Sequence, residues 1–216
     1  MGLRNGNQRD IFGASAGQFG GASDVFFNLA QSGFCVFAHL LAIGRVMPKS
    51  HSRLLPRLWL MTDERMGDAL LPSIGRLPKG AGVIFRHYSL ASAERAVLFD
   101  AVKRLARARR LTLVFRGRLG GHGRHRGALT APVHSIPERI AAERNGARLI
   151  FVSPVFPTTS HPGGRALGRV GFGQLIRGSA VPVIALGGMT PKRARSLGAF
   201  GIYGWAAISS LTGQKL

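Results

Sequence analysis

The chain has 216 residues, 45% of them hydrophobic, and is therefore long enough to bury a core as one globular domain. Its 30 Lys and Arg residues against 9 Asp and Glu give a formal charge of +21, which favours anionic partners such as phosphate esters, nucleic acid or acidic lipid. The single cysteine, Cys35, excludes an intrachain disulfide and a cysteine-based metal cluster, in keeping with a cytoplasmic location.

The basic residues form no block, and neither a zinc-finger spacing nor an aromatic RNA-binding motif is present, so specific nucleic-acid binding is not expected. Residues 25–44 are apolar, but polar residues interrupt them and no A-x-A-like cleavage site follows, so we expect no signal peptide and no membrane partner. Met47 then stands directly before a strand-like run. We expect residues 1–46 to be a poorly ordered or peripheral N-terminal extension and residues 54–216 to form the domain.

From Leu58 onward, short apolar runs alternate with helical patterns, which predicts a parallel α/β fold. We expect Ser92 to cap a helix with one apolar face, formed by Val97, Leu98, Ala101, Val102 and Leu105. Ser135 with Glu138 forms a capping box for a later helix, and Thr190 caps another. The expected strands are residues 58–62, 82–85, 111–115, 129–133, 149–152, 181–186 and 202–208.

The pattern fails between Arg116 and Gly127, which is too polar for a barrel strand and too rich in glycine for a helix. Gly127 and Thr130 are also too close for a helical crossover between parallel strands. His122 and His125 lie in this segment, and we expect them, like His87, to be solvated or to face phosphate. No metal site is expected, because an arginine beside each imidazole repels a cation.

Residues 149–164 join an apolar strand to a loop of Ser, Thr, Pro, His and Gly, as expected where a buried parallel strand empties into a ligand-binding loop. The hydroxyls of Thr158, Thr159 and Ser160 suit a phosphate. The alternative is that this segment is only a proline-rich turn between a strand and a helix. In a (β/α)8 barrel, the loops after the last two strands usually bind phosphate, and here those strands end in Gly187-Gly188 and Ser209-Ser210.

Six segments between residues 58 and 209, given at the end of this paragraph, resemble in sequence and order the thiamine phosphate synthase and TenI family of TIM barrels. The resemblance implies a TIM (β/α)8 barrel with one β/α unit irregular or incomplete, and it implies a phosphate site at Thr158, Ser160, Gly187, Gly188, Ile208 and Ser209. Arg86 matches a family arginine after the second strand, and His161 replaces the lysine of the family loop. The similar segments are L-W-L-M-T-D (58–63), F-R-H-Y (85–88), A-P-V-H-S (131–135), S-P-V-F-P-T-T-S-H (153–161), I-A-L-G-G-M (184–189) and G-W-A-A-I-S (204–209).

The chain departs from the synthase pattern at the metal ligands. The synthase joins a pyrimidine pyrophosphate to a thiazole phosphate with Mg²⁺ held by aspartates after the third and fourth strands. Beyond Asp100, this chain has only Glu138 and Glu143, both on an expected helix. Arginines would have to neutralise the leaving pyrophosphate instead, and the candidates are Arg86, Arg116, Arg118, Arg124 and Arg126.

The TenI branch carries out a metal-free isomerisation of a thiazole phosphate with a histidine in a motif like Val133-His134-Ser135. An imidazole at a strand end can move a proton near neutral pH without a cofactor. We therefore rank His134-dependent thiazole tautomerase chemistry first, with no cofactor. Thiamine phosphate synthesis, which would need Mg²⁺, comes second. A non-catalytic phosphate-ligand or nucleic-acid binding protein is the alternative of another class. Two points stay open. His134 could instead be an N-terminal helix residue that bonds to backbone and has no catalytic role, and the chain could be a monomer or a homo-oligomer.

Overall fold

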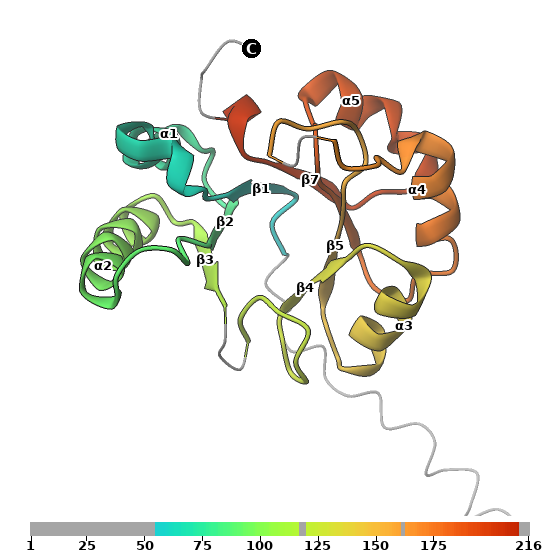
Figure 1. Cartoon of the computed structure of the whole chain (residues 1–216), viewed down its shortest axis with the longest axis horizontal. Helices are drawn as coiled ribbons and strands as arrows, with labels where there is room; N and C mark the ends of the chain where they lie inside the picture. Colours follow the sequence, from blue (N-terminus) through green and yellow to red (C-terminus); the bar gives the residue numbers. More distant parts are fainter. Residues whose placement is uncertain (1–54, 117–119, 161–162, 212–216) are drawn as a thin grey trace, which may run out of the picture. The chain divides into compact units, whose positions relative to one another are not determined.

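The computed structural model of the chain describes residues 55–116, 120–160 and 163–211, and strands alternate with helices along them (Figure 1). The strands are β1 (Leu58–Met61), β2 (Gly82–Phe85), β3 (Thr112–Phe115), β4 (Thr130–Val133), β5 (Leu149–Val152), β6 (Val183–Ala185) and β7 (Gly204–Ala207). The α-helices are α1 (Leu70–Arg76), α2 (Ser92–Ala108), α3 (Ile136–Arg144), α4 (Gly168–Ile176) and α5 (Pro191–Ser196), with 3-10 turns η1 (Glu64–Ala69), η2 (Gly198–Phe200) and η3 (Ser209–Leu211).

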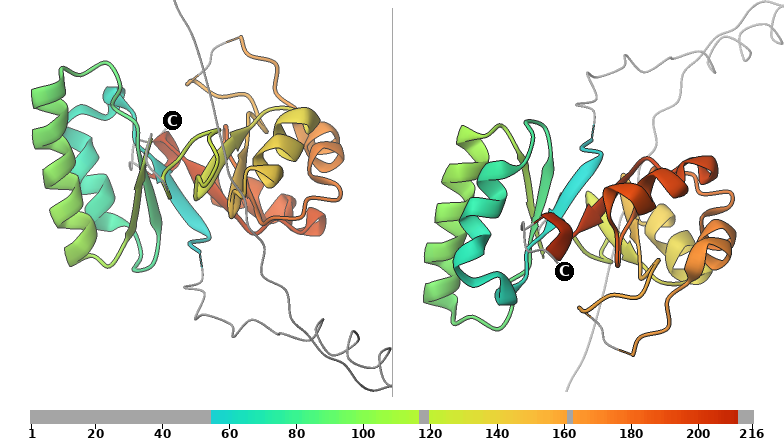
Figure 2. Two further views of the ribbon diagram at one scale, coloured as in Figure 1. Left: turned by 90° about the horizontal axis from the view of Figure 1, so that it is seen from below. Right: turned by 90° about the horizontal axis from the view of Figure 1, so that it is seen from above.

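The seven strands form one sheet in which every pair is parallel, in the order β3-β2-β1-β7-β6-β5-β4. The pairing of β1 with β7 joins the first and last strands of the chain, as in a barrel. Helices α1 and α2 lie on one side of the strands, and α3, α4 and α5 lie on the other (Figures 1 and 2). The fold is an incomplete TIM-like α/β barrel, which confirms the expected fold class.

The sheet edges at β3 and β4 are joined by the segment that the sequence left unassigned. His122 forms isolated parallel bridges to Arg116, just after β3, and to Thr130 of β4. Its N–H donates to the Phe115 carbonyl (2.9 Å), and the Gly123 N–H donates to the Thr130 carbonyl (2.9 Å). Residues 121–123 therefore take the place of an eighth strand, and no helix follows them before β4 in the described residues 120–129.

Alternate residues of the strands fill the barrel interior with an apolar cluster. Trp59, at 0% exposure, meets the ring of Phe151 edge-on at 5.4 Å, and its Nε1 donates to the Pro56 carbonyl. Gly82 stands beside Trp59 because a Cβ there would overlap the indole. Burial of each such large apolar side chain contributes about 1.5–3 kcal/mol to the free energy of folding. The cluster consists of Trp59, Met61, Ile84, Val114, Leu149, Phe151, Ile184 and Ala206.

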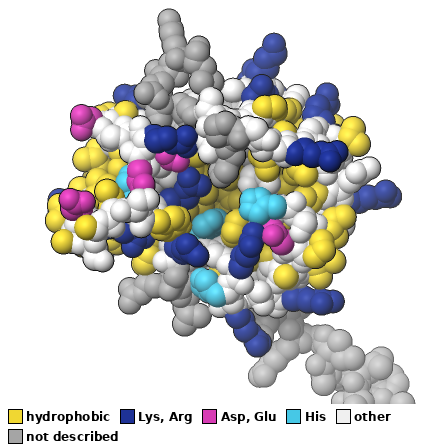
Figure 3. Space-filling view, in the orientation of Figure 1, with side chains coloured by type: hydrophobic (Ala, Val, Ile, Leu, Met, Phe, Trp, Pro, Cys, Tyr) yellow, Lys and Arg dark blue, Asp and Glu magenta, His cyan; other side chains and the backbone are white. Residues whose placement is uncertain are grey.

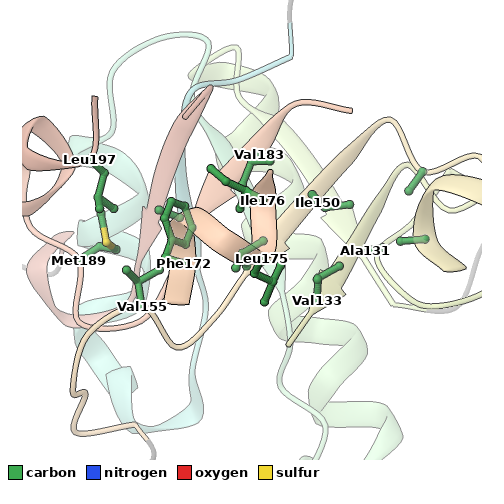
Figure 4. Packing of buried hydrophobic residues seen from close by; sticks show 14 residues of the cluster. Ala131, Val133, Ile150, Val155, Phe172, Leu175, Ile176, Val183, Met189 and Leu197 are labelled. Carbon is green, nitrogen blue, oxygen red and sulfur yellow. The ribbon is translucent and has the colours of Figure 1, made fainter. Parts of the chain in front are cut away.

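Two further clusters pack the helices against the outside of the strands. In one, Phe172, Leu175 and Ile176 of α4 lie among side chains of β4, β5 and β6 (Figure 4). In the other, α1 and α2 cover β1 and β2. Leu98 and Leu105 pack there and Val102 is buried, as the apolar face predicted, but the prediction was wrong for Val97. Val97 is 73% exposed because it lies at the edge of the apolar face of α2, where no other described element covers it.

The helix starts follow the capping residues, with one exception. The Ser135 and Thr190 side chains accept hydrogen bonds from the N–H groups of Glu138 and Arg193, as expected for N-caps. Ser92 is wrong as a cap, since it is the first helical residue, and Ala91 takes the cap position without a side-chain bond. Across the described ranges, no helix has the length and apolarity that a membrane span needs. The expected extension, residues 1–46, lies outside the described residues.

The burial of His122 should make stability depend on pH. Burial, together with the charges of Arg86 and Arg116, lowers the pKa of His122 from 6.5 to about 4. Between these two pH values the unfolded chain binds a proton that the folded chain does not. The contribution of His122 to the free energy of unfolding is therefore at its maximum above pH 6.5 and falls by about 3 kcal/mol as the pH drops to 4. Urea unfolding at several pH values measures this decrease.

His122→Asn is the comparison, because Asn can still bond Thr130 but does not titrate. The variant should show a much flatter pH dependence, with a smaller part left from His87, whose pKa burial also lowers. An unchanged pH dependence in His122→Asn would show that His122 is not held neutral in the folded barrel.

Candidate functional site

A cavity of about 780 Å³ opens at the carboxyl ends of the strands. The residues that line it come mostly from the carboxyl-terminal halves of β1 (Met61), β4 (Pro132) and β7 (Ala207) and from the segments that follow the strands. On this face, Lys, Arg and His side chains border the middle of the surface, and hydrophobic side chains are visible between them (Figure 3). The carboxyl end of a parallel barrel is where ligands bind, because the loops there vary while the strands hold them in place.

The cavity brings together most of the residues that the sequence singled out. Ser209 begins η3, but its side chain is not described, and His161 lies outside the described residues. Beside Ser209, Ser210 lines the cavity and donates a hydrogen bond to the Met189 carbonyl (2.8 Å). The predicted residues that line the cavity are Arg86, His134, Thr158, Ser160, Gly187, Gly188 and Ile208.

The loops after β5 and β6 pack backbone against backbone. The N–H groups of Val155 and Phe156 donate to the carbonyls of Leu186 (2.9 Å) and Gly187 (3.1 Å). Gly187 and Gly188 have φ values of 92° and 59°, and a Cβ on Gly187 would lie 2.7 Å from Pro154 Cα. Only glycine combines this backbone conformation with so close an approach. The turn therefore contributes backbone, rather than side chain, to the lining of the cavity, which Thr158 and Ser160 also line.

Arg86 is held in place by the end of β1. Its Nε donates to the Thr62 carbonyl (3.1 Å) and its Nη2 to Asp63 Oδ2 (3.1 Å). Asp63 also accepts from Arg65 at Nε (2.7 Å) and Nη2 (2.9 Å), and this hydrogen bonding lowers its pKa to about 2. Arg65 in turn donates to the Thr159 carbonyl (3.4 Å). Asp63 thus orients two guanidinium groups and links β1 to the loop after β5.

His134 has a hydrogen bond that fixes its tautomer. Its Nδ1 lies 2.7 Å from the Ser153 carbonyl, and a carbonyl can only accept, so Nδ1 carries the proton. In the neutral ring Nε2 is then the basic nitrogen available in the cavity. The backbone N–H of His134 donates to the Glu138 carboxylate (2.7 Å) at the start of α3. The backbone bond that the sequence suggested as an alternative to catalysis is present, and it leaves Nε2 of the neutral ring without a proton.

We expected His87 and His122 to be solvated or to face phosphate, and the structure contradicts the first of these two options. They are only 5% and 6% exposed. His87 stacks on the Phe85 ring, with 4.9 Å between the ring centroids, and His122 forms bridges to Arg116 and Thr130. His87 Nδ1 lies 3.1 Å from Thr62 Oγ1, and His122 Nδ1 lies 2.9 Å from Thr130 Oγ1. His122 also meets Phe151 edge-on and lines the cavity. Burial makes both imidazoles neutral at physiological pH, since it lowers the pKa of each.

Arginines dominate the charge of the cavity. Arg86, Arg116, Arg124, Arg165 and Arg193 line it, and no Asp or Glu is among the described residues that do. The sequence had named the first three but missed Arg165 and Arg193. Arg193 lies in the first turn of α5, where its guanidinium donates to the Gly188 carbonyl and lies 4.9 Å from the Phe156 ring. Its place three residues after the expected cap Thr190 was the available signal.

Mg²⁺ does not fit the described side chains. It prefers carboxylate oxygens and water in octahedral geometry. Among the described residues no three His, Cys, Asp or Glu side chains gather as a metal site, and the nearby Asp63 already accepts from two guanidinium groups. An anionic ligand is the chemistry that these residues suit.

Comparison with known proteins points to one family. A family model described as thiamine monophosphate synthase matches residues 123–211. A thiamine-phosphate synthase of Pyrococcus furiosus is 34% identical over 85 residues, which are 39% of this chain and 41% of that protein. The chain thus spans about two fifths of the length of that relative. A putative thiamine-phosphate synthase 2 of Aquifex aeolicus is 28% identical over 180 residues, covering 72% of this chain and 97% of that protein.

A solved structure supports the fold. The thiamine phosphate pyrophosphorylase from Pyrococcus furiosus superimposes with a TM-score of 0.60 at 20% sequence identity. The superposition covers 76% of this chain and 90% of that one. It agrees with the incomplete barrel seen here.

The close packing of the Gly187 turn can be tested by stability. Gly187→Ala places a Cβ against Pro154 in a backbone conformation that alanine disfavours, so it should lower the free energy of unfolding by about 3 kcal/mol. Gly198→Ala is the matched control, because nothing lies within 4 Å of its Cβ position. Urea unfolding of the two variants measures the difference, and equal stabilities would contradict the packing of these loops.

Proposed function

Because the chain belongs to the thiamine phosphate synthase and TenI family, we propose that its cavity binds a thiazole phosphate and that the protein is an enzyme that isomerises the thiazole. The phosphate lies against the Gly187-Gly188 turn and the hydroxyls of Thr158 and Ser160. Backbone N–H groups and hydroxyls are neutral donors suited to phosphate oxygens, and the Arg193 guanidinium beside the turn adds positive charge. Ile208, at the end of β7, bounds the same end of the cavity.

His134 is the catalytic residue of this proposal. The isomerisation removes a proton from one carbon of the thiazole system and returns a proton to another, so atoms and charge balance without a cofactor. Nε2 of the neutral imidazole accepts the first proton and donates it back in the second step. The single observation that carries the assignment is the 2.7 Å hydrogen bond from Nδ1 to the Ser153 carbonyl, which favours the tautomer with a basic Nε2 and holds the ring in the cavity wall.

The bond also helps the ring after it gains a proton. The imidazolium retains the Nδ1–H donor to the Ser153 carbonyl, so the ring need not turn between the two steps. Preorganised dipoles of this kind stabilise a charge that develops during reaction. Glu138, at the start of α3, accepts from the backbone N–H of His134 and pairs with Arg124 (3.0 Å). Its carboxylate adds a negative charge close to the ring.

Thiamine phosphate synthesis is the second candidate. The curated relatives favour it by name, and the Aquifex aeolicus protein matches over nearly its whole length. The donor set argues against the usual route, because the described residues offer Mg²⁺ no carboxylate in the cavity. We therefore place the tautomerase first.

The two candidates separate on one variant. His134→Ala should lower the rate of thiazole isomerisation by at least about hundredfold, because it removes the proton shuttle. His125→Ala is the control, since His125 is another described imidazole and does not line the cavity. The assay gives each protein a thiazole phosphate isomer in one reaction and both coupling substrates, with and without Mg²⁺, in another.

Mg²⁺-dependent formation of thiamine phosphate that survives His134→Ala would reverse the ranking. Calorimetry with the thiazole phosphate shows whether the chain binds this ligand, and the turnover assay then distinguishes an enzyme from a binder. Binding without turnover would favour a non-catalytic phosphate-ligand protein, and no binding at millimolar ligand would contradict both candidate activities.

A further inference from the structure

The outer surface of α4 and α5 carries positive charge that no described carboxylate balances. After Glu143 the chain contains no Asp or Glu, whereas Lys and Arg continue to its end. Glu143 itself pairs with Arg139 (2.9 Å). The Glu138 carboxylate is likewise paired, with Arg124 (3.0 Å). The exposed cations on these two helices and the α4 cap that lie outside the cavity and have no ion pair among the described residues are Arg169, Arg177, Lys192 and Arg195.

Helix α2 is basic as well, but its charge is mixed. Glu94 and Asp100 lie in the same helix as Lys103 and Arg104, so negative and positive side chains alternate along it. The surface of α4 and α5 has no such mixture. A partner that supplies negative charge is therefore attracted to this surface more strongly than to α2.

One face of α4 presents an apolar side chain, an aromatic ring and a cation in a row. Val170 is 72% exposed. Gly173 comes three residues later and Arg177, the C-cap, seven residues later, so the three positions lie on the same face of the helix. The Phe200 ring covers Gly173, where a Cβ would lie 2.5 Å from a ring atom, and the ring stays 37% exposed. Val170, Phe200 and Arg177 thus form a row, which we call the α4 strip.

A hollow of about 330 Å³ lies beside the α4 strip. Its lining includes Ile176 and Arg177 at the end of α4, Val183 at the start of β6, and Phe200. The Phe200 ring is held from behind, because Phe172 meets it edge-on at 6.3 Å. The hollow shares no lining residue with the large cavity, so it is a separate site among the described residues. A preformed hollow with an aromatic wall suits one large apolar side chain of a partner.

The arrangement favours a protein partner over nucleic acid or a membrane. Interfaces between proteins have an apolar and aromatic centre with a polar rim, and here Val170 and Phe200 form the centre while Arg169 and Arg177 form the rim. Nucleic acid is held mainly by cations against phosphates, so it would leave the apolar centre unused. A helix that lies in a membrane surface buries its apolar face in lipid, but the apolar face of α4 already packs on the strands.

We propose that the α4 strip and the hollow beside it dock an acidic segment of another protein. An apolar side chain of that segment lies against Phe200, and its carboxylates pair with Arg169 and Arg177. The inference goes beyond the proposed function and does not depend on it, because the strip and the hollow lie outside the cavity.

A fluorescein-labelled peptide of Asp and Glu residues with one central Leu is the probe. Fluorescence anisotropy measures its binding to the full chain, beside a second peptide in which Ser replaces the Leu. The Leu peptide should bind about tenfold more tightly than the Ser peptide, because burial of the Leu side chain adds to the attraction between charges. Equal affinities of the two peptides would overturn the proposal.

Variants of the apolar centre locate the binding. Phe200→Ala should weaken binding of the Leu peptide at least about tenfold, because it removes the aromatic wall of the hollow. Val170→Ser should weaken it several-fold and, at an exposed position, should leave the urea midpoint unchanged. Val97→Ser is the matched control, since Val97 is equally exposed (73%) but lies on α2. Equal effects of Val170→Ser and Val97→Ser would contradict docking at the α4 strip.

The charged rim has its own pair of variants. Arg177→Met should weaken binding of the Leu peptide several-fold, because it removes a cation beside the hollow. Arg104→Met removes the same charge from the exposed surface of α2 and should change the affinity less than about twofold. If the two variants weaken binding equally, the peptide responds only to net charge and the docking site is wrong.

Duplex DNA and vesicles of phosphatidylglycerol separate the classes of partner. Binding of either should be insensitive to Phe200→Ala and Val170→Ser. If these variants weaken binding of DNA or vesicles and leave binding of the Leu peptide unchanged, the α4 strip serves nucleic acid or lipid, and the protein partner is wrong.

Discussion

The cavity depends on the hydrogen bonds that residues 121–123 make to the two edges of the sheet. Parallel strands bring their carboxyl ends to one side, but a seven-stranded sheet with free edges would leave β3 and β4 apart. The His122 N–H and the Gly123 N–H bond to carbonyls on the two edges, and the His122 side chain bonds Thr130. This short bridge completes the ring, so that Arg116 after β3 and His134 after β4 line the same cavity.

The ring of strands could be predicted because each strand is a short, mainly apolar run that ends at a polar or glycine-rich segment. A parallel strand is buried on both faces, so it appears in the sequence as a continuous apolar run whose position can be recognised. The phosphate-type loops also followed from the sequence, because hydroxyls and a Gly-Gly pair after successive strands converge in a barrel. The apolar face of the long helix was also predicted, except that Val97 lies at the edge of this face and stays exposed.

The bridge and the buried imidazoles could not be predicted in the same way. Gly121, His122 and Gly123 have no apolar pattern, since only one side chain enters the interior and its two neighbours are glycines. His122 is buried because Thr130 accepts or donates one hydrogen bond and Phe151 supplies an apolar edge, and both partners are distant in sequence or come from other strands. The tautomer of His134 likewise depends on the Ser153 carbonyl, nineteen residues away, which no local pattern indicates.

The chemistry follows from which charges the cavity contains. Arginines surround it, the nearby Asp63 is already paired, and the described lining has no carboxylate, so the cavity favours anions over cations. Because the described lining has no carboxylate, a neutral imidazole is the candidate proton acceptor there. In the proposed function this acceptor is His134, whose tautomer the Ser153 carbonyl fixes.

Long-range ¹H–¹⁵N correlation spectra of the histidine rings, with His134 assigned from a His134→Gln variant, test this claim most directly. We predict a His134 ring protonated at Nδ1, with an unprotonated Nε2 whose resonance shifts when a thiazole phosphate is added. A ring protonated at Nε2 with Nδ1 free, or an Nε2 resonance that does not respond to saturating ligand, would contradict it.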